Sequence, residues 1–150
     1  MAKKEWKASE LYSVVNGVAA MAVARKLQKN FRTKSIAITV EQWSLLYHLW
    51  KKDGLTQQEL CNKTFKNKPS VTRLIDNLEK QQLVKRNSSQ EDKRKKIICL
   101  TKQGKQLQLP TKHLAEITLN EALKNISLHE INTVRQVLQK VYDNVQCNNT

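Results

Sequence analysis

Apolar residues recur at helical spacing along most of this chain, and the clearest case is the stretch Asn67 to Gln81. Pro69 fits the first position of a helix here because proline has a fixed φ and no N–H to satisfy. Four residues follow the i, i+3, i+4, i+7 pattern of one buried helix face: Val71, Leu74, Ile75 and Leu78. The opposite face is polar and basic, so the helix suits either solvent or a DNA groove.

A helix is predicted ahead of this stretch, after Thr39. Thr39 with Gln42 three residues later is the capping-box signature of a helix start, and Asp53-Gly54 stops the helix. Its apolar residues should line one buried face: Trp43, Leu46, Tyr47 and Trp50.

The same signature recurs at once in Thr56 with Glu59. It starts a short helix, Gln57 to about Thr64, with Leu60 and Cys61 turned inward. Two short helices joined by a tight link, the second amphipathic and basic at its start, form the helix-turn-helix pattern.

The periodicity changes after residue 81. Leu83 to Arg86 reads as a short strand, residues 87 to 93 are polar and turn-rich, and Lys96 to Leu100 read as the returning strand. The sequence therefore predicts a β-hairpin with a cationic tip, of the kind called a wing.

Long helices flank this central part. One starts near Ser9 and ends between Phe31 and Ser35, and its length suggests a face reserved for a partner subunit. Thr101 caps another, which Pro110 should bend or stagger. Ser127 with Glu130 starts the last. The helix after Thr101 should have these residues inside: Gly104, Leu107, Leu114, Ile117, Ala122 and Leu123.

The net charge of the chain is the strongest indication of what its surface binds. Its 150 residues carry a formal net charge of +14, and a polyanion is the natural partner of such a surface. Residues 51 to 105 hold 15 Lys and Arg against 6 Asp and Glu, a net of +9, whereas residues 106 to 150 balance to zero. The excess is therefore concentrated on the predicted helix-turn-helix and wing.

Several classes of protein fit poorly. The three glycines, at 17, 54 and 104, cannot make a P-loop or a G-x-G-x-x-G cradle, so we expect neither an enzyme nor a bound cofactor. The uninterrupted apolar run, residues 17 to 24, is far shorter than the roughly 20 residues that span a bilayer.

The cysteines and histidines predict no metal site. Cys61, Cys99 and Cys147 are odd in number and irregularly spaced, which suits a reducing, cytoplasmic compartment and leaves a redox role open. The histidines are scattered: His48, His113 and His129.

These residues together resemble the MarR family of bacterial transcriptional regulators over nearly the whole chain. The resemblance is carried by LTQQEL, by VTRLIDNLEKQQLVKR, by the wing residues Asp92-Lys93-Arg94, and by Leu100-Thr101-Lys102-Gln103-Gly104. It implies one domain over residues 1 to 150, with a winged helix-turn-helix at about 36 to 104. The family likeness further implies a homodimer built from helices at about 8 to 35 and 105 to 146.

The resemblance also implies which side chains contact DNA. The recognition helix would enter the major groove, and the wing would reach the minor groove, with Asp92 orienting its arginine. The recognition-helix positions are Asn67, Lys68, Ser70, Thr72, Arg73 and Asn77, and the wing positions are Lys93, Arg94 and Lys95. Gln82 stands where relatives often have glycine, so we expect a left-handed conformation borne by a residue with a Cβ.

We therefore expect a sequence-specific regulator, a repressor, that acts on a palindromic operator. The alternative is a winged-helix module that binds an acidic protein. A further hypothesis is a small anionic or aromatic effector held between the dimer helices and the winged domain, with these walls: Arg25, Trp43, Tyr47 and Trp50. The competing interpretation is that the aromatic residues simply fill the core.

Overall fold

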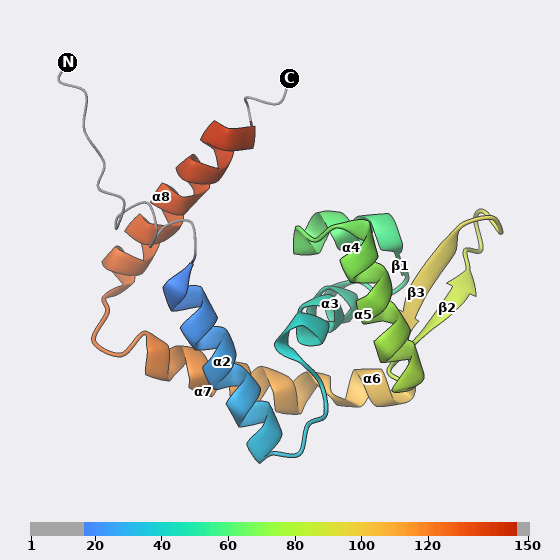
Figure 1. Ribbon diagram of the computed structural model, residues 1–150, viewed down its shortest axis with the longest axis horizontal. Helices are drawn as coiled ribbons and strands as arrows, with labels where there is room; N and C mark the ends of the chain where they lie inside the picture. The colour runs from blue at the N-terminus through green and yellow to red at the C-terminus, as the bar shows by residue number, and fades with distance from the viewer. Residues whose placement is uncertain (1–16, 147–150) are drawn as a thin grey trace. The chain divides into compact units, whose positions relative to one another are not determined.

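The computed structural model describes residues 17–146. The chain divides into two compact units, and the boundary along the sequence falls between Thr118 and Leu119. The first unit is helical apart from a small antiparallel sheet of three strands (Figure 1). This confirms the predicted fold class, a mainly α protein with a β-hairpin wing. The start of the predicted first helix, including Ser9, lies outside the described residues, as does Cys147.

The elements follow in chain order. The helices are α2 (Val18–Thr33), α3 (Val40–Lys51), α4 (Gln57–Thr64), α5 (Lys68–Lys80), α6 (Lys102–Gln106), α7 (Gln108–Ala122) and α8 (Leu128–Gln146). The strands are β1 (Leu55–Thr56), β2 (Val84–Ser88) and β3 (Lys96–Leu100).

The capping boxes of α3 and α4 are confirmed. The Thr39 hydroxyl accepts a hydrogen bond from the Gln42 N–H at 3.1 Å, and the Gln42 side chain accepts from the Thr39 N–H at 2.9 Å. Thr56 and Glu59 make the same reciprocal pair. The hydrogen bond from the Thr56 backbone N–H lowers the pKa of Glu59 below its usual value.

Helix α5 buries the predicted face and ends as expected. Pro69 is its second residue, not its first, because Asn67 is the N-cap and Lys68 begins the helix. The N–H of Leu83 bonds to the carbonyl of Leu78, a Schellman turn in which Gln82 has a φ of 59°. The left-handed Gln82 is therefore confirmed.

The sheet has one strand that the sequence did not reveal. Strand β1 is only two residues long, and it pairs antiparallel with β3 at Leu55–Ile98, giving the order β1-β3-β2. Two residues carry no measurable periodicity, so tertiary pairing alone defines this strand. Strand β2 also extends to Ser88, two residues beyond the prediction.

The buried face of α3 differs from the prediction. Leu45, Leu46 and Leu49 are fully buried, whereas Trp43 and Trp50 are half-buried and Tyr47 is 39% exposed. Only Leu46 of the predicted face is therefore central in the core. Trp43 and Trp50 therefore pack against the edge of the core.

The helix after Thr101 is interrupted as predicted. It separates into α6 and α7 at Leu107, three residues before Pro110, whose nitrogen cannot donate to the preceding turn. Its buried residues include Thr111 and Thr118, not the predicted Ile117, which is 38% exposed. The two threonine hydroxyls bond to carbonyls one turn back, so they can be buried without an unsatisfied polar group.

The second unit contains α8, which the Ser127–Glu130 capping box starts as predicted. No residue of α8 is buried. Its exposed apolar residues recur mainly at helical spacing: Val134, Val137, Leu138, Val141, Tyr142 and Val145. Within residues 17–146, no helix is both long and apolar enough to cross a membrane.

Candidate nucleic-acid interface

The outward face of α5 presents two of the predicted reading residues directly. Arg73 and Asn77 are exposed, and Arg73 has no hydrogen-bond or ion-pair partner among the described residues. Asn77 lies toward one side of this face, where it lines a hollow of about 510 Å³ together with Arg32 and Lys80. Because the two residues are four positions apart, they lie next to each other on the same exposed face of α5.

Two other residues predicted to contact DNA, Asn67 and Thr72, form hydrogen bonds within the protein. The Asn67 side-chain oxygen caps α5 by accepting from the Ser70 N–H at 2.9 Å. The Thr72 hydroxyl donates to the Lys68 carbonyl at 2.9 Å and accepts from the Gln57 amide at 2.5 Å. Asn67 and Thr72 thus set the start of α5 and its fit against α4.

Gln57 was missed in the sequence. It is the first residue of α4, and its amide also donates to the Lys68 carbonyl at 3.4 Å. The available signal was its place immediately after the Thr56 cap. That place puts its side chain at the start of the helix, but only the fold brings it to the start of α5.

The wing presents Lys93, Arg94 and Lys95 at an exposed turn. The Asp92 carboxylate accepts from the Arg94 backbone N–H at 3.0 Å, and the Asp92 carbonyl accepts from the Lys95 N–H at 2.9 Å. Asp92 therefore shapes the turn through the backbone and leaves the Arg94 guanidinium pointing to solvent.

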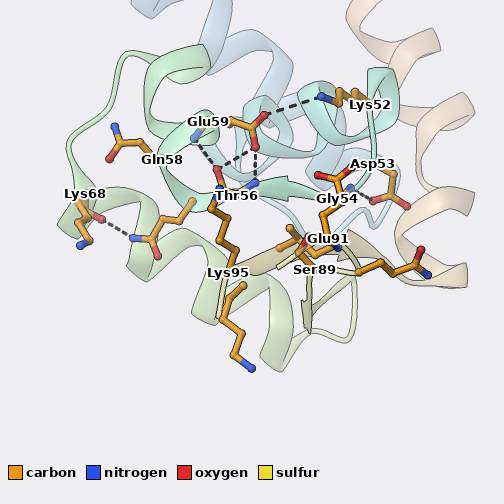
Figure 2. A pocket seen from close by; sticks show the side chains of 14 residues that line it. Lys52, Asp53, Gly54, Thr56, Gln58, Glu59, Lys68, Ser89, Glu91 and Lys95 are labelled. Atoms are coloured by element: carbon orange, nitrogen blue, oxygen red, sulfur yellow. Dashed lines mark hydrogen bonds and ion pairs between the residues drawn. The ribbon is translucent and has the colours of Figure 1, made fainter. Parts of the chain in front are cut away.

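A groove of about 910 Å³ lies between the start of α4 and the wing (Figure 2). Lys68 comes to it from α5, and Lys95 and Lys96 come from the wing. The groove thus has a cation from each of the two elements that were predicted to contact DNA.

The nearest carboxylates in this groove are already engaged. Asp53 accepts hydrogen bonds from the backbone N–H groups of Leu100, at 2.8 Å, and Gly54, at 3.0 Å. Glu59 is held by the Thr56 cap, as Figure 2 shows. These two acids serve the fold, whereas Glu91 is exposed and also lines the groove. The groove therefore presents Lys68, Lys95 and Lys96 together with one exposed carboxylate.

Arg86 on β2 is a second residue that the sequence did not reveal. Its guanidinium donates to the carboxylates of Asp76 and Glu79, both on α5. Its backbone N–H donates to Glu79 at 3.1 Å. Burial acts to lower the Arg86 pKa, but the hydrogen bonds to the two acids outweigh it and raise the pKa. Arg86 thus ties the wing strand β2 to α5.

The residues suggested as effector walls are only partly brought together. Trp43 and Tyr47 are in contact, with ring centroids 5.6 Å apart. The Trp50 indole N–H instead donates to the Gly104 carbonyl at 2.9 Å, and Arg25 is exposed on α2. Neither of the two hollows described above is lined by these four residues. Within residues 17–146, the buried indole N–H of Trp43 has no hydrogen-bond partner.

The cysteines remain separate thiols in the described part of the chain. Cys61 is buried and Cys99 is half-buried, and neither forms a disulfide. No cluster of three His, Cys, Asp or Glu residues between 17 and 146 could hold a metal ion.

Comparison with known proteins gives a consistent result. Residues 38–96 match the model of the MarR family. The chain is 31% identical over 106 residues to the uncharacterized HTH-type transcriptional regulator YdgJ of Bacillus subtilis, a match that spans 71% of this chain and 63% of that protein.

Solved structures resemble the fold over nearly the whole chain. Transcriptional regulator PA3341 superposes with a TM-score of 0.76 at 28% identity, covering 90% of this chain and 98% of that one. Bordetella bronchiseptica BpsR, whose DNA binding is regulated by 6-hydroxynicotinic acid, superposes with a TM-score of 0.80 at 18% identity. That match covers 93% and 99% of the two chains.

Proposed function

We propose that this chain, which belongs to the MarR family of transcriptional regulators, binds double-stranded DNA and selects its sequence. The observation that carries the proposal is the placement of exposed cations on two elements, Arg73 on α5 and Arg94 on the wing. Lys68, Lys95 and Lys96 add positive charge along the groove between α4 and the wing. The family and the net charge of +14 support it.

Each element would read DNA in its own way. Arg73 can donate two hydrogen bonds to a guanine edge in the major groove, and Asn77 suits adenine. Arg94 would be attracted to the minor groove where the groove is narrow and its potential most negative. The phosphates between the two grooves would lie against Lys68, Lys95 and Lys96, which give affinity without sequence choice.

The exposed apolar face of α8 supports a homodimer. A soluble monomer rarely leaves so many apolar side chains on one helix face in water. A two-fold dimer would place two recognition helices about 34 Å apart, so the operator would be palindromic. We infer that the protein acts in the cytoplasm and that it represses transcription by occupying this operator.

Salt dependence tests the proposal. We expect affinity for a duplex to fall steeply with salt, with a slope of several units on a log-log plot, because bound lysines release condensed counterions. Lys68→Ala should reduce the slope by about one unit. Lys112→Ala, at an exposed residue of α7, should leave the slope unchanged. A slope near zero in fluorescence-anisotropy titrations would reject DNA binding and favour an acidic protein partner.

A small effector is the second part of the proposal. The buried Trp43 N–H has no partner among the described residues, and a water or a ligand can satisfy a buried donor of this kind. The regulation of BpsR by 6-hydroxynicotinic acid makes a small aromatic acid a suitable class to test. Such a molecule would change operator affinity only through its different affinity for the two arrangements of the dimer.

We expect a phenolic or heteroaromatic acid to raise the Tm and weaken operator binding, and Trp43→Phe to reduce both responses by removing the donor. Differential scanning fluorimetry and anisotropy over a broad set of such acids would measure them. If no acid changes either quantity, the effector hypothesis is wrong, while the DNA proposal is unaffected.

A further inference from the structure

Asp76 is an acidic residue on the face of α5 that would meet DNA. It follows Arg73 by three residues and precedes Lys80 by four, and both spacings allow an ion pair along one helix. Its carboxylate is instead bound to Arg86 on β2. Asp76 therefore pairs with a residue of the wing strand and not with a cation of its own helix.

Arg86 makes three contacts to α5, and they divide into two kinds. Glu79 holds both the backbone N–H and the guanidinium of Arg86, so it fixes the position of the strand. Asp76 contacts the guanidinium alone. Losing the contact between Asp76 and Arg86 would therefore change the charge on this face of α5 but would leave the backbone contact between Glu79 and β2 in place.

The pairing of Asp76 with Arg86 affects which groups Arg73 can bind. Without Arg86, the Asp76 carboxylate would be an unpaired negative charge on a surface that faces phosphates. The nearest cation along the sequence of α5 is the Arg73 guanidinium, one turn away, so Asp76 would form an ion pair with Arg73. That pair would occupy the donors that Arg73 needs for a guanine edge. Glu79, six residues from Arg73, is too far along the helix to do the same.

We propose that Arg86 is a positioning residue for DNA reading: by binding Asp76 it keeps that carboxylate away from Arg73, so both donors of Arg73 remain available to a base. This inference rests on the proposed DNA-binding function. It adds a role for a residue outside the predicted contact surface, whose side chain acts through Arg73.

The test uses the full-length protein and an operator selected from a random duplex pool. Arg86→Gln should lower discrimination at the base pair read by Arg73 by about tenfold, within the range of one bidentate base contact. Arg86→Gln with Asp76→Asn should restore it, because the competing charge is gone. Arg86→Gln with Glu79→Gln is the matched control, with the same net charge, and should stay impaired.

A purely structural role predicts otherwise. If Asp76→Asn fails to restore discrimination in the Arg86→Gln background, or if Arg86→Gln alone changes nothing, the proposal is wrong. Thermal melts of every variant show whether each protein folds. The Asp76→Asn rescue separates the two roles even where Arg86→Gln lowers the Tm.

A readout without DNA keeps this inference separate from the proposed function. NMR of the Arg73 Nε–H in the free protein should show slower proton exchange in Arg86→Gln than in the native chain, and Asp76→Asn should reverse the change. Unchanged exchange would overturn the inference whether or not the chain binds DNA. A native protein that selects no operator would instead overturn the proposed function.

Discussion

Replacing both Arg73 and Arg94 with alanine is expected to abolish the discrimination between an operator and a random duplex. Each base-reading arginine contributes about 1–3 kcal/mol of discrimination, so the double variant should lose roughly 10²- to 10⁴-fold in the ratio of the two affinities. Competition binding at fixed salt measures this ratio directly. Both side chains are exposed, so the Tm should hardly change.

A matched variant removes the same charge elsewhere. Lys29 and Lys112 are exposed on α2 and α7 and belong to neither α5 nor the wing, so replacing both with alanine should leave discrimination intact. If the arginine double variant keeps its selectivity, the assignment of α5 and the wing as reading elements is wrong. If the lysine variant loses as much, total charge and not base contact decides the effect.

The largest stability loss is expected for Gly104→Ala. A Cβ on Gly104 would lie 2.1 Å from the carbonyl oxygen of Leu83, which already accepts a hydrogen bond from the Thr101 N–H at 3.1 Å. That carbonyl is backbone, so the clash can be relieved only by moving the wing away from α6. We expect a loss of about 3 kcal/mol and a Tm lower by roughly 10 °C.

Thermal unfolding at a single protein concentration would measure this change, since dimerisation would make the Tm depend on concentration. Lys105→Ala, at the next residue of α6, is the control: its contact with Asp53 is a long, exposed ion pair of 3.9 Å, and its loss should change stability by under about 0.5 kcal/mol. A Gly104→Ala protein as stable as this control would mean that the Leu83 carbonyl can move.

Much of the candidate interface could be predicted because its signals are local. The Thr39 and Thr56 caps depend on residues three positions apart, and the buried face of α5 depends on helical spacing, so both follow from the order of residues. The left-handed Gln82 was predicted only through the family resemblance, because relatives often have glycine at this position.

The roles of individual polar side chains were harder to predict. Thr72 has a polar side chain of the kind that contacts DNA, yet its hydroxyl is hydrogen-bonded to Gln57, fifteen residues earlier in the chain. Asp92 acts on Arg94 through the Arg94 backbone N–H. The opposite charges of the two residues in the sequence suggest a side-chain ion pair instead. A polar residue on an exposed face can serve the fold or a ligand, and its type does not distinguish them.

By itself, the sequence determined that this protein is a chain of capped helices with a basic hairpin wing, because caps, turns and periodicity act over a few residues. Only the tertiary structure decided which charges remain available on that surface. Asp53, Asp76 and Glu79 are engaged by groups that lie apart from them in the chain. Hydrogen bonds and ion pairs act through distances in space, and the order of residues does not give those distances until the chain has folded.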